Sequence, residues 1–228
     1  MKISGYFTRG ELILWGSSVL LITASFLIFD RESFLTLAAS LIGVTSLIFA
    51  AKGNPLAQAL MIVFSLLYGY ISFSFRYYGE MATYLGMTGP MAVFSLVSWL
   101  RNPFEGRRSE VKVNRISAAE TVFMLVLTGG VTVLFWFILR HFGTANLLPS
   151  TISVTTSFIA VYLTFRRSEY FALAYAANDV VLILLWSLAA FRDPSYISVI
   201  VCFAAFLVND IYGFISWRKM SIRQAAAA

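Results

Sequence analysis

Long apolar stretches occupy most of the chain, and short polar segments separate them. A helix that crosses a membrane needs about 20 predominantly apolar residues, so each stretch of that length predicts one span. Charged residues and clusters of proline and glycine divide the chain into such segments, at about residues 11–29, 34–51, 55–75, 81–100, 117–139, 147–165, 169–190 and 194–217. The pattern therefore predicts an all-α polytopic membrane protein with eight transmembrane helices.

Four of the predicted helix starts carry a local signal of their own. Two have a hydroxyl residue followed three positions later by glutamate, the spacing of a capping box in which both side chains accept backbone N–H groups. Two others have asparagine or aspartate directly before a proline, which is tolerated at the first helical position because its missing N–H would have no partner there. The pairs are Thr8 and Glu11, Ser117 and Glu120, Asn54 and Pro55, and Asp193 and Pro194.

The composition excludes a water-soluble domain. Hydrophobic residues make up 59% of the 228 positions and charged residues 12%, whereas soluble domains have roughly 45–50% apolar and about 25% charged residues. Disorder is excluded as well, because 16% of the residues are aromatic. One cysteine, Cys202, and one histidine, His141, provide neither a disulfide framework nor a His/Cys metal site. We therefore expect no metal and no cofactor, and any chemistry must come from carboxylates, amides and aromatic rings.

The basic residues are distributed unevenly between the two sides that eight spans define. Of the 17 lysines and arginines, only Arg31, Arg76, Arg140 and Arg192 lie on the side opposite to the termini. By the positive-inside rule, both termini are predicted to lie in the cytoplasm. The net charge of +6 is then explained without a nucleic-acid partner. No Ala-x-Ala site closes the first apolar stretch, so we expect a retained helix rather than a cleaved signal peptide.

Two parts of the chain resemble each other. Residues 95–101 (SLVSWLR) are similar to residues 213–218 (GFISWR), and Thr45-Ser46 is similar to Thr156-Ser157. The segments 34–101 and 147–218 are therefore interpreted as copies of one three-helix unit. An odd number of connecting helices makes the copies parallel. Chance similarity between apolar segments is the alternative.

This repeat divides the chain into five predicted parts. They are an N-terminal accessory helix (1–33), a first three-helix repeat (34–101), a cytoplasmic loop with a connecting helix (102–146), a second repeat (147–218) and a C-terminal tail (219–228). The predicted architecture is one helix plus a 3+1+3 parallel repeat. Parallel copies related by an axis along the membrane normal leave a pathway between them, with a site near the bilayer midplane.

Longer sequence runs resemble a known family. Residues 175–186 (YAANDVVLILLW) and 206–217 (FLVNDIYGFISW) look like those of the nicotinamide riboside transporters of the PnuC type. Further matches in the first half are residues 51–54 (AKGN), 67–70 (LYGY), 78–80 (YGE) and 89–91 (GPM). The resemblance covers about residues 34–218.

The resemblance implies the 3+1+3 fold of the SWEET sugar carriers and uptake of nicotinamide riboside by facilitated diffusion with alternating access. It also implies the cytoplasmic membrane of a bacterium, a homotrimer, and a cytosolic kinase that phosphorylates the transported riboside and so traps it. Ala92 departs from the family pattern, in which a glutamine follows the Pro-Met pair. A carrier for thiamine or riboflavin is therefore an alternative.

Polar residues deep within the spans are the candidate substrate-binding residues, because they are costly in lipid. Asn178 and Asp179 lie near the middle of the 169–190 span, and Asn209 and Asp210 lie in the cytoplasmic half of the 194–217 span. Counted from the loop that joins these spans, the two pairs differ in depth by only roughly 4–5 Å, at about 1.5 Å per residue. One ligand could contact both pairs.

Aromatic residues accompany these polar pairs. Tyr175 and Trp186 recur at helical spacing on the same predicted face as Asp179, and Tyr212 is three positions after Asn209. Such rings suit stacking on a cationic pyridinium, and amide and carboxylate groups suit ribose hydroxyls. The alternative is that the amides and carboxylates only form hydrogen bonds between helices.

Other polar and aromatic residues are open to two interpretations. Gln58 is a further candidate for the pathway, although headgroup contact would suit it equally, and Glu80 serves either solvation or gating at the outer end. Glu120 is expected to be used by its capping box. Trp99 and Trp217 are predicted to be interfacial anchors, because both end a span on the cytoplasmic side.

Three classes of function are compatible with these residues. A passive carrier is favoured, and a variant of it would couple transport to protons or sodium through Asp179 or Asp210. An intramembrane aspartyl protease would use the two aspartates as an acid–base pair, but no Gly-x-Gly-Asp context surrounds them. A structural or assembly factor would not need amides, carboxylates and aromatic rings at one depth.

Overall fold

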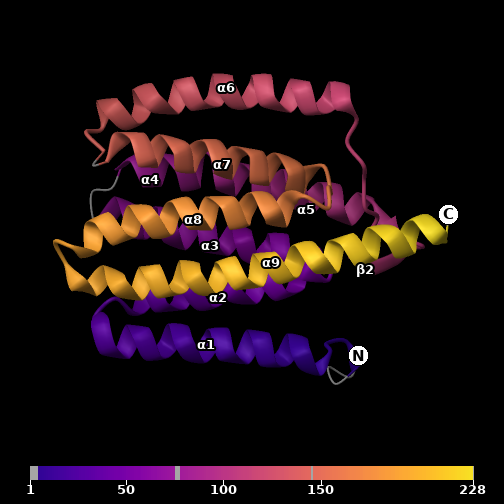
Figure 1. Ribbon diagram of the computed structural model, residues 1–228, viewed down its shortest axis with the longest axis horizontal. Coiled ribbons are helices and arrows are strands. Elements are labelled where there is room, and N and C mark those ends of the chain that lie inside the picture. Colours follow the sequence, from indigo (N-terminus) through magenta and orange to yellow (C-terminus); the bar gives the residue numbers. More distant parts are fainter. Residues whose placement is uncertain (1–4, 75–77, 145, 228) are drawn as a thin grey trace.

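The computed structural model describes residues 5–74, 78–144 and 146–227, and within them seven helices are long and apolar enough to cross a membrane. They are α1 (Arg9–Phe29), α2 (Phe34–Ala51), α3 (Leu56–Ser74), α6 (Ala118–His141), α7 (Leu147–Phe165), α8 (Phe171–Ala190) and α9 (Ile197–Ala226). They run side by side with both termini at one end (Figure 1). The chain is thus a helical multi-pass membrane protein. Arg76 and the predicted end of the 55–75 span lie outside the described residues.

Most of the predicted helix starts agree with the structure. The Thr8 capping box is complete, because the Glu11 N–H donates to Thr8 Oγ1 at 3.2 Å and the Thr8 N–H donates to Glu11 Oε2 at 2.7 Å. Ahead of α3, Asn54 Oδ1 accepts the Leu56 N–H at 2.9 Å. At the start of η3 (Pro194–Tyr196), the Ser195 N–H donates to Asp193 and holds the pKa of that carboxyl below its usual value.

The capping box predicted at the start of α6 forms only in half. The Glu120 N–H donates to Ser117 Oγ at 3.2 Å, as expected. The Glu120 carboxylate instead accepts a hydrogen bond from Arg166 Nη2 at 3.0 Å, at the end of α7. The expectation that the capping box uses this carboxylate is therefore wrong, because a charged donor on the neighbouring helix competes with the backbone N–H.

The predicted 81–100 span is broken into three pieces. They are α4 (Tyr78–Thr83), a π-helical turn η2 (Tyr84–Thr88) and α5 (Gly89–Arg101). Pro90 has no N–H to offer the helix, and the Gly89 N–H reaches back five residues to the Tyr84 carbonyl. Each piece is too short to qualify as a span, which is why this segment is not among the seven. A Cβ on Gly69 would lie 2.6 Å from Leu85 Cγ, so α3 packs closely on the π-turn.

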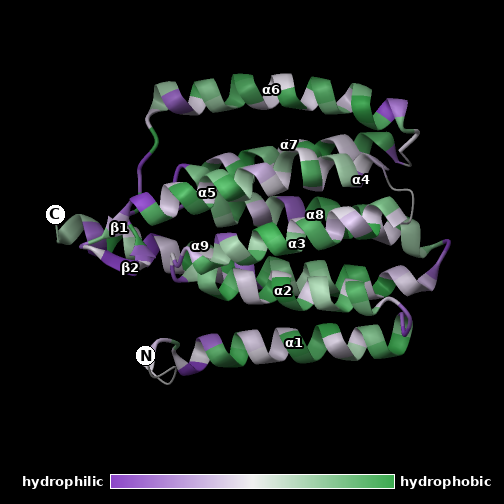
Figure 2. Ribbon diagram, turned by 180° about the vertical axis from the view of Figure 1, so that it is seen from behind, coloured by the Kyte–Doolittle hydropathy of each residue, from purple (hydrophilic) through white to green (hydrophobic). Residues whose placement is uncertain are grey.

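The lipid-facing helices lie at the two edges of the bundle. Figure 1 shows α1 along one edge and α6 along the other. In each of these helices, only 22% of the apolar 18-residue stretch that could span a membrane is buried. Val126 and Phe137 of α6 are exposed, as expected for side chains in contact with lipid tails. In Figure 2 the hydrophilic residues gather at the helix ends and in the hairpin β1 (Pro103–Phe104) and β2 (Arg107–Val111).

Trp99 and Trp217 are buried inside the bundle rather than placed at its surface. Each is 0% exposed, and their ring centroids lie 5.4 Å apart. The Trp99 indole N–H donates to the Thr164 carbonyl at 2.8 Å, and that of Trp217 donates to the Ala50 carbonyl at 2.7 Å. The prediction that they are interfacial anchors is therefore wrong. An indole N–H that reaches a spare lone pair of a carbonyl at the end of a neighbouring helix can be buried completely.

The residues next to these tryptophans repeat the same pattern. Ser98 Oγ donates to the Phe165 carbonyl at 2.9 Å, and Ser216 Oγ donates to the Ala51 carbonyl at 2.7 Å. In each case one helix donates hydrogen bonds to the last carbonyls of another: α5 to α7, and α9 to α2. The contacts are reciprocal between residues 34–101 and residues 147–218.

The hairpin holds the end of the bundle that carries the termini. The Val111 N–H donates to the Gly53 carbonyl at 2.9 Å, and the Val113 N–H donates to Gln224 Oε1 at 2.8 Å. Gln224 belongs to α9, which continues nine residues past its predicted end at Trp217 and includes most of the segment predicted to be a tail. The hairpin contact supports this helical extension.

Candidate functional site

A cavity of about 930 Å³, counting the space at its mouth, lies between the helices of the bundle. Its wall is mostly apolar, and α2, α3, α7, α8, α9 and the broken segment α4–η2 all contribute to it. The polar side chains of the wall that can bind a ligand through a carboxylate, amide or hydroxyl group include Glu80, Ser153, Ser157, Asn178, Asp179 and Asp210. Five of the eight predicted site residues line this cavity: Tyr175, Asn178, Asp179, Trp186 and Asp210.

Asp179 and Asp210 form the acidic part of the cavity wall. They are 3% and 4% exposed, and their carboxyl groups interact directly between α8 and α9. Oδ2 of Asp179 is buried without a hydrogen-bond partner in the described part of the chain. Two adjacent carboxylates repel each other unless a proton or a cation lies near them. The pair therefore provides a place for a positively charged or hydrogen-bond-donating group.

Asn178 is held in one orientation by α7. Its Oδ1 accepts hydrogen bonds from Thr156 Oγ1 at 2.8 Å and from Ser157 Oγ at 3.1 Å. Both lone pairs of the amide oxygen are thereby used. The NH₂ group remains available as the donor that Asn178 can offer to a ligand in the cavity.

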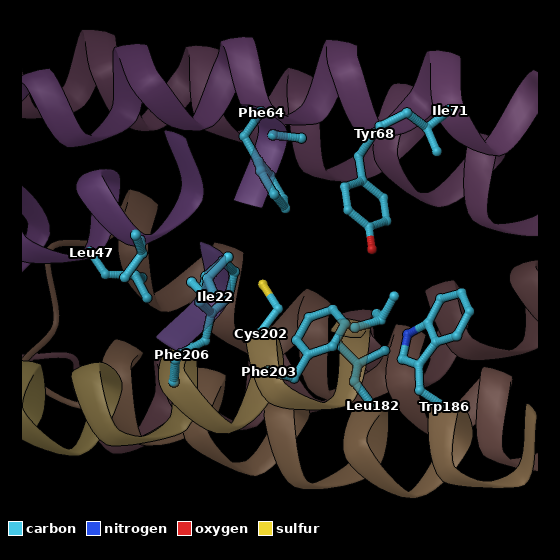
Figure 3. Close-up of a cluster of buried hydrophobic side chains, with 14 residues drawn as sticks. Ile22, Leu47, Phe64, Tyr68, Ile71, Leu182, Trp186, Cys202, Phe203 and Phe206 are labelled. Atoms are coloured by element: carbon cyan, nitrogen blue, oxygen red, sulfur yellow. The ribbon is translucent and has the colours of Figure 1, made fainter. Parts of the chain in front are cut away.

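Aromatic side chains face one another across the middle of the molecule. Figure 3 shows Phe64 and Tyr68 on one side and Trp186, Phe203 and Phe206 on the other, with the Tyr68 oxygen pointing into the space between. All of these except Tyr68 also line the cavity. Trp186 is 8% exposed, and the centroid of its ring lies 5.2 Å from that of the Tyr196 ring. The wall thus offers flat aromatic faces beside the carboxylates.

The other predicted site residues lie away from the cavity. Asn209 Nδ2 donates to Ser18 Oγ of α1 at 2.9 Å, and the Tyr212 hydroxyl donates to Glu11 Oε1 at 2.9 Å. Gln58 is 5% exposed but is not part of the cavity wall. Asn209 and Tyr212 therefore form hydrogen bonds between helices, which is the alternative interpretation given from the sequence. Neighbouring helical residues point about 100° apart, so Asp210 lines the cavity while Asn209 contacts α1.

Several residues of the wall carried no usable signal in the sequence. Tyr84 reaches the cavity from the π-turn, and Phe64 and Phe206 are ordinary members of apolar runs. Their positions depend on how the helices are rotated and broken. Glu80 was recognised as a charged residue at an outer helix end, but its place in the wall was not predictable.

The cavity continues into a wide vestibule at the end of the bundle opposite to the termini. About 1,540 Å³ of space, counting its open mouth, lies there between α4, the loop that follows α6 and the end of α8. The two spaces have five wall residues in common: Glu80, Thr144, Ser150, Leu185 and Trp186. At the opposite end, Trp99, Trp217 and Phe171 pack against one another. The cavity is therefore accessible from the vestibule end.

Comparisons with known proteins point to one family. The family described as nicotinamide mononucleotide transporter matches residues 33–219. The chain is 25% identical to the nicotinamide riboside transporter PnuC of Neisseria mucosa, over 98% of this chain and 86% of that protein. It is 22% identical to the protein of the same name from Haemophilus influenzae, over 83% and 81% of the two chains.

A solved structure has the same fold. The crystal structure described as the vitamin B3 transporter PnuC is similar with a TM-score of 0.82, and the match covers 96% of this chain and 94% of that one. The sequence identity between the two is 22%. The helix α1 precedes the segment that the family match covers, but the fold similarity extends over nearly the whole chain.

Proposed function

Because the chain belongs to the nicotinamide mononucleotide transporter family, we propose that it is a carrier for the uptake of nicotinamide riboside. The observation that carries this proposal is the cavity wall, which combines buried carboxylates, an oriented amide and aromatic rings. The cationic pyridinium ring suits Asp179, Asp210 and the face of Trp186. The ribose hydroxyls suit the NH₂ group of Asn178, with Tyr175 beside it.

The charge of the wall favours the riboside over the mononucleotide. The ionisable acids among its described residues are Glu80, Asp179 and Asp210, and none of the described wall residues is lysine, arginine or histidine. A phosphate group is normally held by arginine, lysine or a helix N-terminus. Three carboxylates would repel it. Thiamine, which is also a cation, is the second candidate, and the neutral ring of riboflavin fits this wall less well.

Uptake into reconstituted vesicles tests this proposal. Vesicles that contain the protein should take up labelled nicotinamide riboside, and excess unlabelled riboside should compete more strongly than thiamine or nicotinamide mononucleotide. An intramembrane protease or an assembly factor would give no uptake. A vesicle that takes up thiamine but not the riboside would reassign the substrate within the same class of carrier.

The proposed architecture is eight spans, arranged as α1 plus a 3+1+3 repeat with the boundaries predicted from the sequence. The broken segment α4–η2–α5 supplies the eighth span, and α6 connects the two three-helix repeats. The reciprocal hydrogen bonds of Trp99 and Trp217 support this division, since the last helix of each repeat is hydrogen-bonded to the first helix of the other. Rocking of the two repeats about the cavity would provide alternating access.

Transport is proposed to be passive, in the cytoplasmic membrane of a bacterium, with both termini in the cytoplasm. A carrier of this kind only equilibrates its substrate, so accumulation requires a cytosolic kinase. The resemblance to the family also supports a homotrimer in the lipid bilayer. The apolar outer faces of α1 and α6 are available for lipid or for neighbouring subunits.

The orientation can be tested with single cysteines. Cys202 is 5% exposed in α9 and is first replaced by alanine. A cysteine in place of Ser109, in β2, should then be labelled only from the cytoplasmic side, and one in place of Ser195 only from outside. The reason is that three proposed spans, α6, α7 and α8, lie between these two positions, and an odd number of crossings places them on opposite sides. Labelling of both positions from the same side would contradict the proposal.

Trp186→Ala is expected to weaken riboside binding by roughly 2- to 30-fold, because a stacked ring contributes about 0.5–2 kcal/mol to a bound cation. Isothermal titration of the purified protein measures this change. Trp136→Ala is the matched control, since Trp136 lies half-buried in α6 and is not part of the cavity wall. Equal affinities of wild type and Trp186→Ala would reassign Trp186 to packing.

A further inference from the structure

Glu80 occupies the neck between the vestibule and the inner cavity. It belongs to the walls of both spaces, and it is the one ionisable residue among the five that the two described walls share. A substrate that moves from the vestibule to Asp179 and Asp210 passes through the space that Glu80 and the other four shared residues line. Its side chain is half-buried, so its charge is less screened there than at an open surface.

The packing of Gly79 fixes the position of Glu80. A Cβ on Gly79 would lie 2.6 Å from Leu139 Cδ2 and would also collide with Thr144 Oγ1. With no Cβ at this position, α4 lies directly against the end of α6 and the loop that follows it, and a larger residue would require Leu139 and Thr144 to move. The next residue, Glu80, is thereby placed at the neck rather than at the outer surface.

Glu80 differs from the glutamates that stabilise the structure. The carboxylates of Glu11, Glu105, Glu110, Glu120 and Glu169 each pair with a lysine or an arginine. Within residues 5–74, 78–144 and 146–227, Glu80 has no such ion pair. The neighbouring side chain that interacts with Glu80 is the neutral Ser72 hydroxyl of α3, so a cationic ligand would supply the missing countercharge. Deeper in the cavity, Asp179 is 3% exposed and its Oδ2 has no hydrogen-bond partner among the described residues, so it has the same requirement.

We propose that Glu80 is an outer binding subsite for the positive charge of the substrate and that it selects cations over neutral analogues. The inference rests on the proposed function. The pyridinium pairs first with Glu80 at the neck and then with Asp179 and Asp210 in the inner cavity. A series of carboxylates lets the charge enter the membrane without losing its counter-ion at any step, which reduces the cost of removing it from water.

The test compares two substrates of nearly equal shape in the reconstituted protein. Nicotinamide riboside carries the pyridinium charge, whereas its reduced form, dihydronicotinamide riboside, is uncharged. Glu80→Gln is expected to lower kcat/KM for the charged riboside by roughly tenfold, the lower end of the effect of close charge pairs. Uptake of the reduced form should be almost unchanged. The ratio of the two rates within one preparation does not depend on the amount of folded protein.

Glu32→Gln is the control for a general effect of charge. Glu32 lies in the loop between α1 and α2, at the same end of the bundle but outside both walls, and its removal should leave the ratio unchanged. Glu80→Ala is the second variant, and the ratio of its uptake of the charged riboside to that of the reduced riboside is measured in the same way. An equal loss for both substrates, or no loss for either, would overturn the role of Glu80 alone. Absence of riboside uptake by the wild type would overturn the proposed function as well.

Discussion

Asp179→Asn is expected to weaken the binding of nicotinamide riboside by about 100-fold. Removing one member of a desolvated charge pair costs about 2–5 kcal/mol or more, and each 1.4 kcal/mol is about tenfold in affinity. Asp179 is 3% exposed and its Oδ2 has no partner in the described part of the chain, so the ligand is the group that would satisfy it. Equilibrium binding of labelled riboside to the purified variant measures the effect.

The same variant should not lose stability. An unpartnered buried carboxylate oxygen costs free energy in the absence of substrate, so the melting temperature of unliganded Asp179→Asn should equal or exceed that of the wild type. Asn209→Ala should behave in the opposite way. It removes hydrogen bonds to Ser18 and Ala205 and should lower the melting temperature while riboside affinity persists. A large loss of affinity in Asn209→Ala would place Asn209 in the site after all.

Asp179→Asn also separates passive from coupled transport. In a passive carrier the aspartate need not change its protonation, so residual exchange should be independent of a proton or sodium gradient. In a coupled carrier the variant would lose gradient-driven accumulation but retain exchange. We expect the passive result. Accumulation by wild-type vesicles without kinase, above the outside concentration and driven by an imposed gradient, would contradict it.

Trp217→Ala is expected to destabilise the protein by about 3–5 kcal/mol, the usual cost of removing a buried tryptophan side chain. The ring is 0% exposed, contacts Trp99 and Phe171, and donates to the Ala50 carbonyl at 2.7 Å. Its loss leaves a cavity at the junction of the two proposed repeats and removes one of the hydrogen bonds to the Ala50 carbonyl. Thermal unfolding followed by size-exclusion chromatography in detergent measures the change.

Trp99→Ala should have a similar effect, because its contacts with α7 mirror those of Trp217 with α2. Trp136→Ala, on the half-buried face of α6, is the control and should change the melting temperature much less. A melting temperature of Trp217→Ala close to that of Trp136→Ala would show that the junction contributes little to stability.

The extents of most helices could be predicted because the signals for them are local. The apolar run of residues 147–165 coincides with α7, and the Thr8 capping box and the Asn54 cap form as their spacing indicates. Pro90, the second residue of α5, causes a disturbance because it has no N–H to offer the helix, but residues 81–100 were predicted as one unbroken span. The sequence did not indicate that the disturbance would be a π-turn that divides the segment, since the Gly89 N–H could equally have remained unpaired or bonded to water.

The candidate site could be predicted only in part. The Asn178-Asp179 pair and Trp186 belong to the cavity wall, as one face of a helix predicted, but of the Asn209-Asp210 pair only the aspartate does. Glu80 and Tyr84 became wall residues through the way α4 packs and the way the helix breaks. Whether the wall residues bind substrate is decided by the binding and uptake experiments.

By itself the sequence determined that this is a multi-pass helical membrane protein of a transporter family, and it located the polar residues within the spans. Hydrophobic length, caps and sequence resemblance are all properties of the chain that need no partner segment. Only the tertiary structure decided which faces of the helices meet. The physical reason is that lipid tails are as apolar as leucine side chains, so an apolar residue suits the outside and the core of the bundle equally. Trp217 could therefore be mistaken for a surface anchor, and Asn209 for a residue of the cavity, until the neighbouring helices were in place.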